Sequence, residues 1–194
     1  QNCISIVGSF AGDLRVKHRR ALGLRYVPEQ RLGEATVPEM SLESNTLLTS
    51  NLFLAKGFMR NKMIARFTRS IIEKFHVRCG GPKAPAESLS GGNLQKFIVG
   101  RELLHNPKVM VLNQPTWGED AGAATLIRNA LIRQRSGGSA ILVVGEELDE
   151  LFEICDELVV MSEGKISPQV KTKDVSVEEI GRWMSGLWPE AKEQ

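Results

Sequence analysis

The segment Leu89-Ser90-Gly91-Gly92-Asn93-Leu94-Gln95-Lys96 contains the residue types best suited to chemistry in this chain. A serine and two glycines that open a helix leave several backbone N–H groups unpaired at the positive end of the helix dipole. Glycine lets an anion approach this backbone closely, and the serine hydroxyl is one more donor. The pattern predicts a phosphate-binding turn, although a plain Ser-Gly-Gly helix cap is the simpler interpretation of the motif taken alone.

Three other polar segments each follow an apolar run. They are Pro28-Glu29-Gln30-Arg31, the stretch from Asn113 to Asp120, and Gly145-Glu146-Glu147-Leu148. The acidic residues from Glu146 to Glu153 suggest a metal site or, more simply, a solvated helix start, because acidic side chains suit a helix N-terminus. The solvated start is preferred, and no metal ligand is assigned.

Apolar runs rich in β-branched residues predict the strands that position these segments. The runs are 4–7, 24–27, 109–112, 140–144 and 158–161, the last turning through Glu163-Gly164-Lys165. The two longest runs look buried on both faces, as strands of a parallel sheet are. Helical segments lie between them, so the predicted class is α/β.

The stretch from about Ser41 to His76 predicts an inserted helical subdomain. Ser41 is a plausible N-cap, and apolar residues recur at helical spacing with basic residues between them. This apolar stripe comprises Leu47, Leu48, Leu52, Leu54, Met59, Met63, Ile64, Phe67, Ile71, Ile72 and Phe75.

Three further helices are expected. One follows Gly92, and one runs from Ala121 to Arg135 and stops at Gly137. The last begins with the capping box Ser176-Val177-Glu178-Glu179 and is expected to bury Val177, Ile180, Met184 and Leu187.

The order of these segments resembles the ATP-binding cassettes of ABC transporters, over about residues 1–167. In that family's terms the segments are the glutamine loop, helical subdomain, signature, Walker B strand, D-loop and switch strand. The wording Tyr-Val-Pro-Glu, Leu-Ser-Gly-Gly-Asn-x-Gln-Lys and Glu-Glu-Leu-Asp-Glu is similar to the second cassette of tandem importers for simple sugars and nucleosides. Gln-Pro-Thr after the Walker B strand favours the nucleoside branch.

The resemblance implies a P-loop NTPase-type α/β fold with a mostly parallel sheet, incomplete here, and the inserted helical subdomain. The implied divisions are 1–40 (partial core with the glutamine loop), 41–105 (helical subdomain with the signature), 106–167 (Walker B, D-loop and switch) and 168–194 (connector and helix). No Walker A motif occurs in the sequence. Since the family places that loop before residue 1, we expect a truncated cassette.

Four positions depart from the family pattern. Asn113 stands where an aspartate holds Mg²⁺, and Gln114 stands where a glutamate is the general base. Glu146 replaces the switch histidine, and Glu29 occupies the glutamine-loop position. An amide cannot accept a proton from attacking water and is a poorer magnesium ligand than a carboxylate.

The signature itself is intact, so we expect an asymmetric pair of cassettes in which this chain is the non-hydrolysing half. Cassettes of this family dimerise head to tail. Ser90, Gly91, Gly92, Asn93 and Gln95 would then meet ATP held by a partner cassette. Neutral drift in a catalytically dead module remains the alternative.

The sequence leaves two alternative roles for each of two residues after the Walker B strand. Asp120 matches the D-loop aspartate, which crosses the dimer interface in the family, but an ordinary helix N-cap fits equally. Trp117 either packs at a cassette interface or covers the neighbouring helix.

The implied partners are a second cassette and membrane permease subunits, with ATP and Mg²⁺ as cofactors of the complete transporter and neither held tightly by this chain alone. The 25 basic and 23 acidic residues of the 194 are mixed along the chain, so no nucleic-acid partner is expected. The scattered Cys3, Cys79 and Cys155 indicate reduced thiols. No apolar run approaches the ~20 residues of a membrane span. We therefore expect a cytoplasmic protein, peripheral on the inner face of the cell membrane.

Two rival classes are a regulatory or scaffold ABC module and a non-transport ABC ATPase. The second class includes DNA-repair ATPases, whose long coiled coils are missing here, and translation factors. A further expectation concerns the sheet, because the family's Walker A strand lies between the strands 140–144 and 158–161. Without it, we expect 158–161 to close onto 140–144, another chain to fill the slot, or this region to be poorly ordered.

Overall fold

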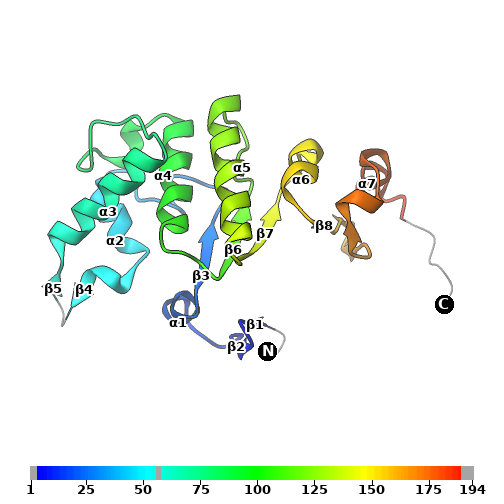
Figure 1. Ribbon diagram of the computed structural model, residues 1–194, viewed down its shortest axis with the longest axis horizontal. Helices are drawn as coiled ribbons and strands as arrows, with labels where there is room; N and C mark the ends of the chain where they lie inside the picture. The colour runs from blue at the N-terminus through cyan, green and yellow to red at the C-terminus, as the bar shows by residue number, and fades with distance from the viewer. Residues whose placement is uncertain (1–3, 56–57, 189–194) are drawn as a thin grey trace. The chain divides into compact units, whose positions relative to one another are not determined.

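The computed structural model describes residues 4–55 and 58–188. The chain divides into two compact units, Gln1–Val144 and Gly145–Gln194. Figure 1 follows the chain from the strands near its N-terminus to the last helix, α7.

A three-stranded parallel sheet forms the centre of the first unit. Its strands are β3 (Leu24–Val27), β6 (Val109–Asn113) and β7 (Ala140–Val144), in the order β3-β6-β7. Tyr26 pairs with Val111, which pairs in turn with Leu142. The three strands were predicted from their apolar runs, and the α/β class is confirmed.

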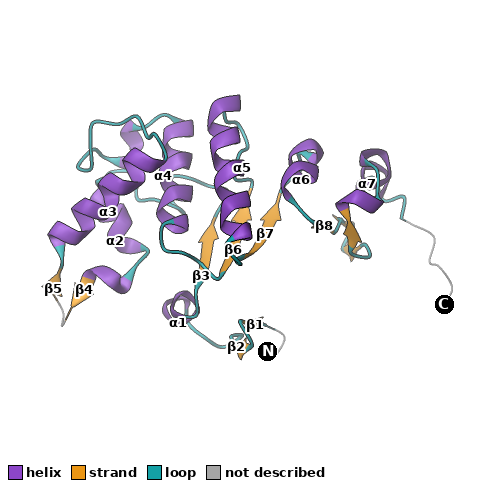
Figure 2. Ribbon diagram, in the orientation of Figure 1, coloured by secondary structure: helices purple, strands orange, loops and turns teal. Residues whose placement is uncertain are grey.

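Helices cover one face of this sheet. Helix α4 (Gly91–Leu103) packs on β3 and on α5 (Ala121–Ser136), and α5 packs on β7. In Figure 2, α5 lies in front of the strands and α4 stands next to it. The short helix α1 (Val16–Ala21) also contacts β3. Helix α5 ends before Gly137, as predicted.

The core lies between the sheet and these helices. Val27, Met110 and Leu112 have no exposed surface, whereas Leu142 of β7 is 59% exposed. The expectation that the longest strands are buried on both faces is therefore wrong for β7. Among the described residues, β7 has only β6 as a hydrogen-bonded neighbour, and α4 and α5 cover a single face.

The stretch predicted to be a helical subdomain folds into α2 (Leu42–Leu48), a 3₁₀ turn (Asn51–Phe53), the hairpin β4 (Leu54–Ala55) and β5 (Phe58–Met59), and α3 (Asn61–Lys74). Ser41 caps α2 by accepting a hydrogen bond from the Ser44 amide at 3.1 Å, as predicted. A second 3₁₀ turn (Ala86–Ser88) precedes α4.

The helical stripe predicted across this subdomain is interrupted. Leu52 lies in the 3₁₀ turn and Leu54 and Met59 in the hairpin, where all three side chains are largely exposed. Over so short an apolar stretch the periodicity does not distinguish a helix from a turn followed by paired strands.

Two hairpins and two helices make up most of the remaining structure. Near the N-terminus, β1 (Ser5–Ile6) pairs antiparallel with β2 (Ser9–Phe10). In the second unit, α6 (Leu148–Ile154) precedes β8 (Glu157–Leu158), and β9 (Met161–Ser162) pairs with β10 (Lys165–Ile166). Strand β8 pairs antiparallel with β11 (Val170–Lys171), which leads into a 3₁₀ turn (Thr172–Asp174) and α7 (Val177–Met184).

Strand β8 pairs with β11 inside the second unit, and the expectation that 158–161 closes onto the switch strand stays a prediction. In α7, Ser176 caps the helix as predicted, and Ile180 is buried together with Trp183, Leu158 and Val160. The prediction that Val177, Met184 and Leu187 are buried is wrong, because they are 42%, 40% and 59% exposed. A helix of eight residues presents only one narrow stripe to such a small core.

Neither a membrane-spanning helix nor a cluster of metal ligands occurs in residues 4–55 and 58–188. No helix there is long and apolar enough to cross a membrane. No group of three or more metal-ligating side chains lies together in that part of the chain. Cys79 is a free thiol, and Cys3 lies outside the described residues.

Candidate nucleotide-facing site

The turn at Ser90 opens helix α4 toward solvent. Ser90 and Gly91 are exposed, and Ser90 makes no side-chain hydrogen bond to the helix backbone. Its hydroxyl instead accepts a hydrogen bond from Asn93 Nδ2 at 2.8 Å, while Asn93 Oδ1 accepts one from the Arg78 amide at 2.8 Å. Within the described residues, the amides of Gly91, Gly92 and Asn93 donate no hydrogen bond. The turn is therefore a set of free donors and not a closed serine cap.

Gln95 supports this turn from beneath. Its side chain is 1% exposed, and Nε2 donates a hydrogen bond to the Pro115 carbonyl at 2.7 Å. This bond ties α4 to the loop after β6. The Gln95 amide group is thus directed into the chain's own interior, whereas Ser90 and Gly91 lie at its surface.

Two charged residues, Arg31 and Glu119, lie directly against the two glycines. A Cβ atom at Gly92 would overlap Oε2 of Glu119, and one at Gly91 would lie 2.7 Å from Nη1 of Arg31. Arg31 Nη2 and Glu119 Oε1 form an ion pair at 2.7 Å, and the Glu119 side chain is fully buried. Neither residue was assigned a role from sequence. Their opposite charges in two of the motif segments were the available signal.

Burial raises the pKa of Glu119, and nearby Asp120 raises it further, while Arg31 opposes both effects. The cause is desolvation, which disfavours the charged carboxylate. Asp120 itself caps α5 by accepting a hydrogen bond from the Ala123 amide at 2.9 Å, so the ordinary N-cap interpretation holds. Trp117, in the same loop, is 60% exposed.

The ends of β3 and β6 bring Glu29 and Asn113 together. Asn113 Nδ2 donates a hydrogen bond to Glu29 Oε2 at 3.2 Å. The next residue, Gln114, has a positive φ of 50°, and its amide donates to the Val144 carbonyl at the end of β7 at 2.8 Å. Side chains from the glutamine-loop and Walker B positions thus meet at the carboxyl edge of the sheet, as expected for parallel strands.

These residues do not fit a magnesium ion. Mg²⁺ prefers carboxylate oxygens in a near-octahedral arrangement. Here Glu29 is the one carboxylate of the pair, and Asn113 directs an N–H donor at it. Glu146, at the switch position, is an exposed residue of the second unit.

A buried ionic network fixes the other end of α4. Arg101 is 2% exposed and donates to Glu102 Oε1 at 2.8 Å, to the Asn45 carbonyl at 3.1 Å and to the Ala35 carbonyl at 3.0 Å. Arg20 reaches both Glu102 and the Thr49 carbonyl. The signature helix is thereby tied to α2 and to the loop that follows Glu29.

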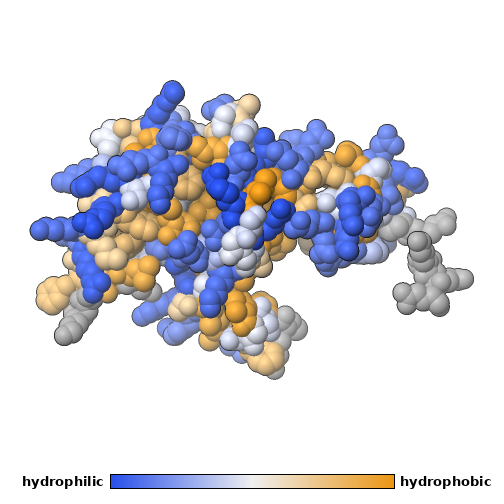
Figure 3. All heavy atoms as spheres, viewed as in Figure 1, coloured by the Kyte–Doolittle hydropathy of each residue, from blue (hydrophilic) through white to orange (hydrophobic). Residues whose placement is uncertain are grey.

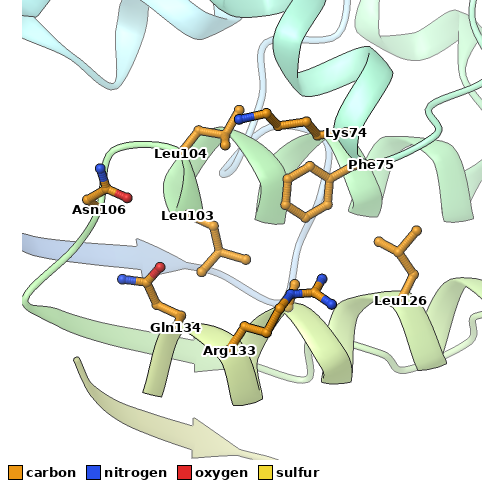
Figure 4. A pocket seen from close by; sticks show the side chains of 9 residues that line it. Lys74, Phe75, Leu103, Leu104, Asn106, Leu126, Arg133 and Gln134 are labelled. Atoms are coloured by element: carbon orange, nitrogen blue, oxygen red, sulfur yellow. The ribbon is translucent and has the colours of Figure 1, made fainter. Parts of the chain in front are cut away.

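A groove of about 390 Å³ lies at that same end of the helix, far from the signature turn. Figure 4 shows Lys74, Phe75, Leu103, Leu104, Asn106, Leu126, Arg133 and Gln134 around it. Twelve residue steps of helix separate Gly91 from Leu103, which is about 18 Å at 1.5 Å per residue. The groove is therefore separate from the turn.

The fold is that of the ATP-binding cassettes of ABC proteins. The chain aligns with the dimeric ATP-binding cassette MJ0796 bound to ADP and phosphate, with a TM-score of 0.69 and 16% identity over 86% of this chain and 72% of that one. It aligns with cbiO1 from Clostridium perfringens, part of the ABC transporter complex cbiONQ, with a TM-score of 0.65 and 20% identity over 93% and 70%. None of the protein-family models matches the chain.

By sequence, the chain is a homologue of the ATP-binding proteins of ABC importers for nucleosides and simple sugars. It is 37% identical to the nucleoside import ATP-binding protein NupA of Lactococcus lactis over 83% of this chain and 32% of that protein. It is 34% identical to the guanosine import ATP-binding protein NupO of Bacillus subtilis over 94% and 36%. It is 33% identical to the ribose import ATP-binding protein RbsA 2 of Rhizobium meliloti over 86% and 33%. The chain thus spans about a third of the length of these curated relatives.

Proposed function

We propose that this chain is part of the ATP-binding, energy-coupling component of an ABC importer for nucleosides or simple sugars. The support is its homology to the nucleoside, guanosine and ribose import proteins. In the complete transporter, ATP and Mg²⁺ are the cofactors. This chain alone binds neither tightly.

The signature turn acts on a nucleotide held by a second cassette, while the chain's own site is inactive. The observation that carries this asymmetry is the contrast between two places in one unit. At Ser90 the amides of three successive residues are free to meet a phosphate. At the strand ends, Asn113 pairs with Glu29 where the family pattern has an aspartate and a glutamine, and Gln114 stands where that pattern has the general base.

The helical subdomain and the loop after Glu29 both face the membrane permease subunits. Its hairpin end supports this, because Leu52, Leu54, Phe58 and Met59 expose between 46% and 79% of their surface. Apolar side chains are visible at this end, at the lower left of Figure 3, whereas hydrophilic ones are spread over the helices. Exposed apolar clusters of this kind are typical of protein–protein contacts. Such contacts would make the protein peripheral on the cytoplasmic face of the membrane.

ATPase activity of the full-length tandem transporter tests the asymmetry. Gly92→Val and Ser90→Arg both obstruct the turn, and both should abolish ATP hydrolysis. Ser90→Arg leaves the packing of Gly92 against Glu119 untouched, so it controls for a folding defect. Gln114→Glu should change the activity little, because Asn113 still provides no carboxylate for the metal.

A transporter that keeps its activity with Ser90→Arg, or gains activity with Gln114→Glu, would contradict this asymmetry. The second candidate function, a catalytically inactive scaffold module, is favoured by one observation, the carboxylate of Glu119 packed on Gly92. For a scaffold, all three variants should leave both ATP hydrolysis and transport unchanged.

A further inference from the structure

The buried carboxylate of Glu119 packs directly against Gly92 of the signature turn. Helix α4 has 13 residues. Its first backbone amides have no partner within the helix and lie at the positive end of the helix dipole. Oε2 of Glu119 abuts Gly92 there, although the side chain is fully buried. An anion at a helix N-terminus is stabilised by the helix dipole and by the free N–H groups. The carboxylate therefore places a negative charge beside the turn, although no amide of the turn donates a hydrogen bond to it.

Arg31 fixes this carboxylate in place. Its guanidinium pairs with Glu119 Oε1 at 2.7 Å and also donates a hydrogen bond to the Trp117 carbonyl. The contact with Glu119 is an ion pair only, because neither Glu119 oxygen accepts a hydrogen bond of good geometry. One side chain thus joins the glutamine-loop segment, the loop after β6 and the start of α4.

The ion pair with Arg31 leaves both carboxylate oxygens of Glu119 without a hydrogen bond. A buried carboxylate normally accepts several hydrogen bonds, and burial without them disfavours the charged form. The pKa of Glu119 is raised for this reason. Within the described residues, one ion pair and no hydrogen bond holds the Glu119 oxygens in this position.

We propose that Arg31 and Glu119 form a latch over the signature turn, and that the turn accepts a phosphate only when the Glu119 carboxylate moves away or loses its charge. This inference rests on the proposed function, since it concerns the turn that meets the partner's nucleotide. A phosphate and a carboxylate about 4 Å apart repel each other, which weakens phosphate binding by about tenfold or more. The ligand class is the terminal phosphate of a nucleotide, and inorganic phosphate is its simplest probe.

The test follows the amide resonances of Gly91, Gly92 and Asn93 in the ¹⁵N-labelled 194-residue chain during titration with inorganic phosphate. Glu119→Gln keeps the shape of the side chain and removes its charge. We expect the half-saturating phosphate concentration to fall at least tenfold in this variant. Glu87→Gln, which removes an exposed carboxylate from the turn before α4, should leave it unchanged. A parallel titration with ATP distinguishes a nucleotide-specific response from one to phosphate alone.

Several outcomes would overturn the latch. If the wild-type chain and Glu119→Gln bind phosphate equally well at these amides, Glu119 does not gate the turn, and the proposed function is unaffected. If Glu87→Gln tightens binding as much as Glu119→Gln, the effect is one of net charge. If no variant shifts these resonances, the turn accepts no anion in this chain, and the ATPase measurements on Ser90→Arg then decide the proposed function separately. A Glu119→Ala variant checks the result, because it also removes the charge but leaves a space.

Discussion

Asn113 donates a hydrogen bond to Glu29 across two neighbouring parallel strands, at 3.2 Å. This contact joins the position expected to bind magnesium to the position expected to be a glutamine. Its chemistry is the reverse of a metal site, because Asn113 directs an N–H donor at the carboxylate of Glu29, where a metal needs oxygen ligands. Relative to the family pattern, residue 113 has lost a carboxylate and gained an amide, and residue 29 has lost an amide and gained a carboxylate.

Asn113→Asp is expected to destabilise the chain by about 1 kcal/mol at pH 7, because two carboxylates would then face each other at a partly exposed site. Urea unfolding measures the loss. Millimolar MgCl₂ should reverse it, since paired carboxylates at this spacing can share a cation. The double variant Glu29→Gln with Asn113→Asp exchanges donor and acceptor and should restore stability without magnesium. Wild-type stability of the single variant in magnesium-free buffer would refute the expectation.

Arg101→Leu is expected to lower the free energy of unfolding by about 3 to 5 kcal/mol, because it removes the main partner of a buried carboxylate and of two carbonyls. Arg101→Lys should not restore it, since one ammonium group cannot reproduce the guanidinium fork that reaches Glu102, Asn45 and Ala35. Denaturant unfolding gives both values. Arg66→Leu, at an exposed position of α3, is the matched control and should stay within about 0.5 kcal/mol of the wild type. A loss below 1 kcal/mol for Arg101→Leu would mean that the network is structurally dispensable.

Gly100→Ala is expected to destabilise the chain although alanine is the better helix former. A Cβ at Gly100 would lie 2.5 Å from a ring carbon of Phe75, so the ring must shift, at a cost of about 2 kcal/mol. The gain in helix propensity is only about 1 kcal/mol. Gly181→Ala, in helix α7, meets nothing within 4 Å and should stabilise its own unit by up to about 1 kcal/mol. Thermal melts followed by circular dichroism compare the two variants. The melting temperature should fall for Gly100→Ala and rise for Gly181→Ala, and any other pair of shifts contradicts the prediction.

The stability of the first unit is expected to fall as the pH drops below 6.5, in part because of His105. The pKa of His105 is lowered to about 4, chiefly by burial and also by the neighbouring Arg25, while Glu102 opposes these effects. Between pH 6.5 and pH 4 the unfolded chain binds a proton that the folded chain excludes, so folding becomes less favourable as the pH falls. The loss should be about 2 kcal/mol between pH 7 and pH 5.

His105→Phe removes this titration. The His105 ring stacks on Phe67 at 4.8 Å, so a phenyl ring fits the same aromatic cluster. Urea unfolding at several pH values should give a shallower dependence for the variant. Parallel curves for the two proteins would show that His105 is not responsible, and an NMR titration of its ring protons gives the pKa directly.

Local chemistry explains what could be predicted about the fold. The strands 24–27, 109–112 and 140–144 follow from short apolar runs rich in β-branched residues, because such runs favour the strands of a parallel sheet. The caps at Ser41 and Ser176 follow from a hydroxyl placed before an amphipathic stretch. The hairpin β4–β5 could not be predicted, because its apolar residues also match a helical period.

The candidate site divides in the same way. The phosphate-binding turn at Ser90 could be predicted because it needs only adjacent residues: a serine, two glycines and a helix. The pair of Glu29 and Asn113 and the ion pair of Arg31 and Glu119 join residues 84 and 88 positions apart. Which of these side chains meet depends on strand order, register and side-chain rotamers.

The sequence by itself therefore determined the class of this protein, its ordered motifs and the loss of charge at positions 113 and 114, since each is a property of neighbouring residues. Only the tertiary structure decided that Gln95 lies inside, that β7 exposes one face, and that a carboxylate rests on Gly92. The physical reason is that burial and electrostatic pairing are set by what the fold brings together, and no local pattern records the distance between two distant side chains.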